Sequence, residues 1–214
     1  MVPNKKMLIK SMVEFGSEAE TKNLIWGHSG NISCRLDEQT YLITGSGAHL
    51  EKLNENDFVV MNLENEEPQD KGKPSIELKM HTEIYKIQKE ANCVFHSQPF
   101  FTTLVSCTDF EVDTKLFPES MAYIEKIGRV EYNHPGSMEL AKSVSEKALN
   151  SDIIILSNHG AICWAKSLDD ALLKTETLEF LCKMLVFSRI SDLKLNFLPQ
   201  ELKDDFLKHL SKLK

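Results

Sequence analysis

The segment from residue 152 to 165, DIIILSNHGAICWA, constrains the fold more than any other part of the chain. Two apolar runs flank the short turn NHG, a pattern typical of two β-strands joined as a hairpin. A connection of this length can join antiparallel neighbours, whereas parallel strands need a crossover of a dozen or more residues. The chain is therefore expected to build a sheet that contains a hydrophobic, antiparallel hairpin.

Further strands and helices are predicted on both sides of this hairpin in the sequence. The runs at 27–36, 40–47 and 57–62 follow one another through short turns and predict a β-meander. Single strands are predicted at 92–97 and 129–132. Because helices are interspersed among strands with short connections, we expect one α/β domain over 1–214, a three-layer α/β/α arrangement around a central, mainly antiparallel sheet.

Serine residues mark the expected starts of three helices. Ser75, Ser137 and Ser167 each precede a segment with apolar residues at helical spacing, and a serine side chain can accept a hydrogen bond from the first turn. In the first of these helices, predicted within 74–90, Ile76 and Met80 are spaced to lie on one buried face. A helix is also predicted within 4–26, and a short one after Pro199.

Composition excludes several classes of protein. The 214 residues carry a net charge of −7 without a basic block, which argues against nucleic acid and anionic membranes as partners. No apolar run reaches the roughly 20 residues of a spanning helix, and the first ten residues lack the features of a signal peptide, so a cytoplasmic protein is expected. The five cysteines have no CxxC spacing and are expected to be reduced core residues.

Three polar residues stand where a core would not require them. Glu77 falls in the first turn of a predicted helix, His96 at the end of a buried strand, and His159 at the tip of the hairpin. Two imidazoles from separate elements could hold a metal ion. Each residue also has an ordinary explanation, because a core histidine can bond to backbone and a carboxylate is favoured at a helix N-terminus.

Two glycine-rich turns, GHSGN and TGSG, form a second candidate cluster. Such turns expose backbone N–H groups, and Asn31, Ser46 and Ser75 could add side-chain donors around an anion such as phosphate. The alternative is that the glycines only close tight hairpin ends.

The order of five segments points to a family. GNIS, ITGSG, KPSIELKMHTEIY, CVFHSQPF and SNHGAICWAKSLDDALLKTETLEFL occur in sequence, and over residues 7–190 this set resembles the class II aldolase and adducin head-domain family. The resemblance implies a fourfold tetramer with active sites between neighbouring subunits and a divalent metal ion, with zinc as the first candidate. It also implies that His96 and His159 bind the metal and that Glu77 acts as acid and base. The residues that match the family's substrate phosphate pocket are Gly30, Asn31, Ser46, Gly47 and Ser75.

The chain departs from the family pattern in its metal motif. The family has a second histidine two residues after the first, where this chain has Gln98. Residues two apart on a strand face the same side, so Gln98 is expected to point at the site and to act as the third metal ligand. A glutamine oxygen is a weaker donor toward zinc than an imidazole, which makes manganese or another oxygen-tolerant ion the alternative.

The expected function is a metal-dependent lyase that cleaves or forms a carbon–carbon bond in a small sugar (ketose) phosphate through an enediolate. Two alternatives remain open at this stage: a 4-epimerase on the same scaffold, and a non-catalytic, adducin-like binding protein, which Gln98 favours. His81, four residues after Glu77, could orient that carboxylate or could simply pack beneath the sheet.

Overall fold

A seven-stranded sheet forms the centre of the protein. The computed structural model describes residues 4–212. The strand order is β3-β2-β1-β4-β7-β6-β5, and neighbouring strands are antiparallel except for the parallel pair β5 and β6. The strands are β1 (Asn31–Arg35), β2 (Thr40–Thr44), β3 (Phe58–Asn62), β4 (Cys93–Ser97), β5 (Ile127–Val130), β6 (Ile153–Leu156) and β7 (Gly160–Ala165).

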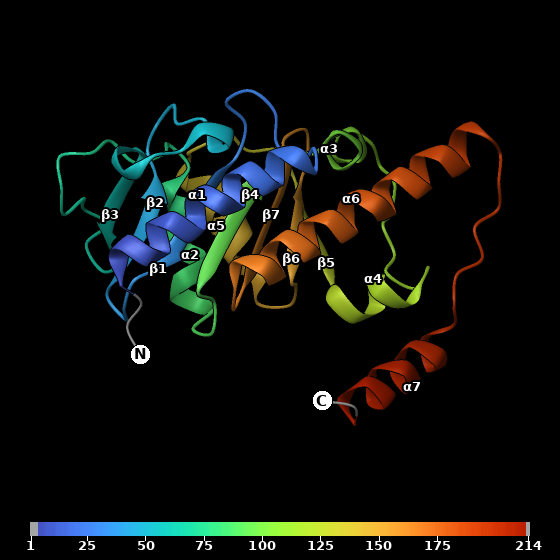
Figure 1. Ribbon diagram of the computed structural model, residues 1–214. Coiled ribbons are helices and arrows are strands. Elements are labelled where there is room, and N and C mark those ends of the chain that lie inside the picture. Colours follow the sequence, from blue (N-terminus) through green and yellow to red (C-terminus); the bar gives the residue numbers. More distant parts are fainter. Residues whose placement is uncertain (1–3, 213–214) are drawn as a thin grey trace.

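Helices cover both faces of the sheet (Figure 1). One layer contains α1 and α6, and the other contains α2 and α5, which pack against each other. Short 3-10 turns, η1 and η2, lie between β2 and β3. The bounds are α1 (Lys5–Thr21), η1 (Leu50–Lys52), η2 (Glu55–Asp57), α2 (Leu78–Ile87), α3 (Phe100–Ser106), α4 (Pro118–Tyr123), α5 (Met138–Ala148), α6 (Leu168–Ile190) and α7 (Gln200–Ser211).

The alternation of side chains along the strands explains the two layers. In β6, Ile153 and Ile155 belong to the hydrophobic cluster under α1 and α6, whereas Ile154 belongs to the cluster under α2 and α5. Successive residues of a strand point to opposite faces, so an apolar run buries both faces at once. The three-layer α/β/α fold with a mainly antiparallel sheet is thereby confirmed.

Most predicted elements are present, with shifted ends. The hairpin, the meander and the helices capped by Ser137 and Ser167 are as expected, and each of these serines accepts a hydrogen bond from the backbone of the first turn. The strand predicted at 129–132 lies at Ile127–Val130. Helices α3 and α4 were not predicted.

The start of α2 differs from the prediction. The helix begins at Leu78 with Glu77 as its N-cap residue, so Ser75 does not cap it, and Ile76 is 61% exposed. Ser75 is held elsewhere, because its backbone N–H donates to the Thr44 carbonyl across an extended segment. Tertiary pairing therefore delays the helix by two residues and leaves Glu77 at its N-terminus.

Four of the cysteines are buried and unbridged, whereas Cys107 is exposed, so the expectation of a core residue was wrong there. Among residues 4–212, no helix is both long and apolar enough to cross a membrane.

Helix α7 lies beyond the sheet, beneath α4 (Figure 1). It is anchored by the buried Lys203, which donates to Thr114 Oγ1 and the Glu125 carbonyl.

Candidate metal and catalytic site

Three elements converge near the centre of the sheet. His96 lies near the end of β4, with Asn31 of β1 and Ile162 of β7 as its partners in the sheet. His159 directly precedes β7, and Glu77 caps α2. The two histidines and the glutamate, which the sequence placed on separate elements, therefore meet.

The cluster is close-packed and buried. The ligand atoms of Glu77, His96 and His159 all lie within 4.8 Å of one another. His96 Nε2 is 3.2 Å from Glu77 Oε2, and His159 Nε2 is 3.3 Å from Glu77 Oε1. The side chains are only 1%, 9% and 8% exposed for His96, His159 and Glu77, respectively. Such a set of nitrogen and carboxylate donors suits a divalent metal ion.

The protonation of His96 can be read from its hydrogen bond. Its Nδ1 lies 2.9 Å from the Ala161 carbonyl, which can only accept, so Nδ1 carries the proton. Nε2 faces the Glu77 carboxylate in a buried site, and unless this nitrogen is protonated too, two acceptors face each other there. This contact is favourable when a proton on Nε2 or a metal ion lies between the two atoms, and the Nδ1 hydrogen bond to a backbone carbonyl is the arrangement found for metal-binding histidines.

The turn before β7 aims His159 at the same point. Gly160 has φ +134°, and a Cβ added there would lie 2.5 Å from the Ser97 carbonyl. The left-handed conformation and the close approach of β4 together require glycine. The tight turn brings His159 Nε2 to 3.3 Å from Oε1 of Glu77, the N-cap residue of α2.

Burial and charge set the ionisation of the cluster. Burial, together with the neighbouring His96, lowers the pKa of His159 to about 4, so its imidazole is neutral near pH 7. Burial raises the pKa of Glu77, but His96, His159 and a hydrogen bond from Asn31 lower it by more. The result is an ionised Glu77 carboxylate and a neutral His159 imidazole, and both are in the state that binds a metal.

Gln98 follows the last residue of β4 and is half-buried. Its Cγ lies 3.0 Å from the position that a Gly160 Cβ would occupy, so it lines the turn that carries His159. Its contribution to a metal site stays a prediction.

The two glycine-rich turns are neighbours in space. Gly45 forms an isolated β-bridge with Pro74, and the Ser46 N–H donates to the Lys73 carbonyl. His28 Nδ1 donates to the Gly47 carbonyl, which links GHSGN to TGSG. The turns therefore enclose one region beside the start of α2.

The five predicted phosphate residues differ in their distance from the cluster. Asn31 donates to Glu77 Oε2 at 2.9 Å, and Ser75 Oγ accepts from the Glu77 N–H at 3.3 Å. Gly30 lies against the His96 backbone, since a Cβ added there would be 2.8 Å from its carbonyl. Ser46 and Gly47 are exposed at the rim. Phosphate binding by this set stays a prediction.

His81 reaches the cluster through Asn31. Its Nε2 is 2.6 Å from Asn31 Oδ1, and its Nδ1 is 2.7 Å from Ser33 Oγ, which in turn is 2.9 Å from the Tyr85 hydroxyl. Ser33 and Tyr85 were missed in the sequence. Their spacing in the sequence could have indicated them. Tyr85 follows His81 by one helical turn and Ser33 follows Asn31 by two strand positions, so each pair shares one face of its element.

Comparison with known proteins identifies the family. Residues 10–186 match the Class II Aldolase and Adducin N-terminal domain. The chain belongs to this family. It is 32% identical over 179 residues to an L-fuculose phosphate aldolase of Methanocaldococcus jannaschii, covering 84% of this chain and 96% of the relative. It is also 30% identical over 198 residues to a 3-oxo-tetronate 4-phosphate decarboxylase of Haemophilus influenzae, covering 90% of this chain and 93% of the relative.

Solved structures support the fold. An L-fuculose 1-phosphate aldolase superimposes with a TM-score of 0.86 over 94% of this chain and 95% of that chain, at 22% identity. The relatives in sequence are named as aldolases and decarboxylases, so the protein is an enzyme of the class II aldolase family. Class II aldolases use a divalent metal ion, which fits the donor set of Glu77, His96 and His159.

Proposed function

We propose that the protein is a metal-dependent lyase that cleaves or forms a carbon–carbon bond in a small sugar phosphate through an enediolate. The observation that carries this proposal is the buried pair of acceptors, His96 Nε2 and Glu77 Oε2, which face each other at 3.2 Å. A proton or a metal ion must lie between these atoms, and membership of a family whose aldolases use a divalent metal ion favours the metal.

In the proposed site, His96, His159 and Gln98 would hold the ion, with zinc as the first candidate and manganese as the alternative. A bound divalent ion would polarise the carbonyl of the substrate and stabilise the negative charge of an enediolate. Gly30, Asn31, Ser46, Gly47 and Ser75 would bind the substrate phosphate through backbone and side-chain donors.

Glu77 would move the proton. Its carboxylate is ionised, buried, and oriented by Asn31, and these properties suit a base that takes a proton from carbon or oxygen and later returns it. Because Glu77 lies between the two histidines, a substrate bound there would be within its reach.

The named substrates of the relatives have a fragment in common. Aldol cleavage of L-fuculose 1-phosphate leaves dihydroxyacetone phosphate and an aldehyde. Loss of carbon dioxide from 3-oxo-tetronate 4-phosphate, a β-keto acid, leaves the enediolate of the same three-carbon ketone phosphate. Both reactions therefore need one site that stabilises this enediolate.

The test is hydrogen exchange of dihydroxyacetone phosphate in deuterium oxide, followed by proton NMR. We expect the metal-loaded protein to exchange one carbon-bound hydrogen beside the carbonyl, and the chelated protein to lose this activity. An absence of exchange in metal-loaded protein would overturn the proposal.

Assays with L-fuculose 1-phosphate and 3-oxo-tetronate 4-phosphate then separate aldol cleavage from decarboxylation. Inversion of a sugar phosphate without release of the three-carbon fragment would instead indicate a 4-epimerase.

We also infer a homotetramer with active sites between subunits, on the basis of the family resemblance. In support, α6 carries large exposed apolar side chains at Phe180, Phe187 and Ile190, which are 53%, 53% and 77% exposed. Light scattering during gel filtration should give a mass of about four chains, and a monomer at micromolar concentration would contradict the inference.

A further inference from the structure

We propose that Tyr85, Ser33 and His81 are positioning residues that hold the Asn31 amide in one orientation, with its NH2 group on the Glu77 carboxylate. The hydrogen-bond direction follows from the structure alone, whereas its consequence for turnover rests on the proposed function.

The contacts form one continuous buried chain. The Tyr85 hydroxyl lies 2.9 Å from Ser33 Oγ, and Ser33 Oγ lies 2.7 Å from His81 Nδ1. His81 Nε2 lies 2.6 Å from Asn31 Oδ1, and Asn31 Nδ2 lies 2.9 Å from Glu77 Oε2. Tyr85, Ser33 and His81 are fully buried, and Asn31 is 6% exposed. The side chains come from β1 and α2, on facing layers of the fold.

The carboxylate sets the direction of the chain. An ionised Glu77 can only accept, so Asn31 turns its NH2 group toward it and its carbonyl oxygen toward His81. His81 Nε2 must then carry a proton. Burial and the neighbouring His96 lower the pKa of His81 to about 3, so the ring is neutral and its Nδ1 is an acceptor.

The same reasoning continues to Tyr85. Since His81 Nδ1 accepts, the single proton of the Ser33 hydroxyl is donated to it, and the Ser33 oxygen accepts from Tyr85. Burial holds the pKa of Tyr85 well above its usual value, so its hydroxyl keeps the proton that it donates. Every donor in this series of hydrogen bonds therefore points toward Glu77.

Ser33 and Tyr85 stabilise the tautomer of His81 that Glu77 sets, because the Ser33 hydroxyl satisfies the buried Nδ1 acceptor and the Tyr85 hydroxyl donates to Ser33. Without their hydroxyls, His81 could carry its proton on Nδ1, and Asn31 could flip so that its carbonyl oxygen faced Glu77. Two acceptors would then oppose each other in a dry site, which is unfavourable. The chain thus fixes both the amide that would meet substrate phosphate and the carboxylate that would move the proton.

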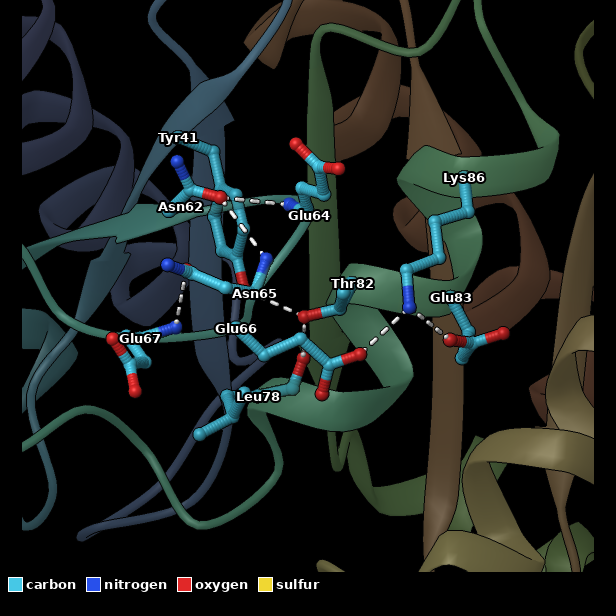
Figure 2. A network of polar contacts seen from close by, with 10 residues as sticks. All are labelled: Tyr41, Asn62, Glu64, Asn65, Glu66, Glu67, Leu78, Thr82, Glu83 and Lys86. Carbon is cyan, nitrogen blue, oxygen red and sulfur yellow. Dashed lines mark hydrogen bonds and ion pairs between the residues drawn. The ribbon is translucent and has the colours of Figure 1, made fainter.

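The protein contains a matched control, in which Tyr41 of β2 bonds to Thr82 of α2. The Tyr41 hydroxyl lies 2.7 Å from Thr82 Oγ1, and Thr82 donates to the Leu78 carbonyl (Figure 2). Tyr41 is 1% exposed and its ring centroid lies 5.1 Å from that of Tyr85. This second series of hydrogen bonds ends at a helix carbonyl instead of Glu77. Tyr41→Phe therefore removes an equally buried hydroxyl without affecting the site.

The first test is nitrogen-15 NMR of labelled histidine in the metal-free protein. We expect wild-type His81 to carry its proton on Nε2, and this N–H to exchange slowly with solvent. Ser33→Ala and Tyr85→Phe should populate both tautomers, whereas Tyr41→Phe should leave the spectrum of His81 unchanged. A wild-type proton on Nδ1, or an unchanged tautomer in Ser33→Ala, would overturn the inference.

The second test is the exchange rate of dihydroxyacetone phosphate. Ser33→Ala should lower it about tenfold, as is typical for residues behind a metal site, and Tyr41→Phe should not change it. His81→Gln, whose amide can still donate to Asn31, should retain more activity than His81→Leu. Wild-type rates in Ser33→Ala with mixed tautomers would overturn the positioning role. If the wild type itself exchanges nothing, the proposed function fails while the tautomer result still decides the hydrogen-bond direction.

Discussion

Glu77 combines three properties that bear on its role in the site. It is the N-cap residue of α2, it is buried, and it contacts both histidines and Asn31. The helix dipole and the hydrogen bond from Asn31 together stabilise its negative charge. A carboxylate held so firmly is suited to move a proton between fixed positions.

Glu77→Gln tests this role. The amide keeps the size of the side chain but cannot accept a proton, so turnover should fall by about 100-fold or more while the protein still binds its metal ion. Turnover is measured by dihydroxyacetone phosphate exchange, and metal content by plasma mass spectrometry. Glu83→Gln is the control, because Glu83 lies on the same helix and pairs with Lys86 at the surface (Figure 2). Unchanged turnover in Glu77→Gln would remove Glu77 from the mechanism.

Gln98→His tests the missing imidazole. A third histidine should raise zinc affinity, by at least the roughly tenfold effect known for changes around metal sites. The measurement is the zinc content of untagged protein purified without chelator, with Gln98→Ala alongside. Equal zinc content in all three proteins would show that position 98 does not contact the ion.

At the scale of elements, the strong patterns in the sequence predicted structure well. The hairpin around His159, the strand that ends in His96 and the helix after Ser167 are long or strongly apolar, and local preference agrees with burial. Helices α3 and α4 have only 7 and 6 residues, too few for a periodic pattern to be recognised.

The candidate site was predictable only in part. His96 and His159 were visible as polar residues at strand ends, and Glu77 as an acidic residue at a helix start. The position of Ser75 was not, because its pairing with Thr44 is a long-range contact that overrides its capping preference. The link from Ser33 to Tyr85 likewise depends on how α2 packs on β1.

The turn at Gly160 offers a test at this scale. Gly160→Ala should destabilise the fold by about 3 kcal/mol or more, because it combines backbone strain with a clash against β4, and it should weaken metal binding by shifting His159. Gly27→Ala is the control: Gly27 also has positive φ, +55°, but open space around it, so a cost of about 1 kcal/mol is expected. Urea titrations measure the free energy of unfolding of both variants. Equal losses in the two would contradict the close approach of β4 to Gly160.

For the whole molecule, the buried histidines predict how stability depends on pH. The pKa of His81 falls from 6.5 to about 3 on folding, and that of His159 falls to about 4. The unfolded chain therefore binds more protons than the folded protein between pH 6.5 and about 4. Stability rises with pH wherever the unfolded state binds more protons, so the metal-free protein should lose stability as the pH falls through this window.

Between pH 6 and 4.5 the unfolded chain should bind at most two protons more than the folded protein. The free energy of unfolding should then change with pH by at most about 2.7 kcal/mol per pH unit. The lowered pKa of Glu77 acts in the same direction at still lower pH, because its stabilising charge is lost on protonation. Urea titrations of the chelated protein at pH 7.5, 6 and 5 measure the slope. His81→Gln removes one titrating group and should lower the slope by up to one proton, whereas substitution of the exposed His134 should not change it. A free energy of unfolding that stays constant from pH 7.5 to 5 would show that these histidines accept protons without unfolding the protein.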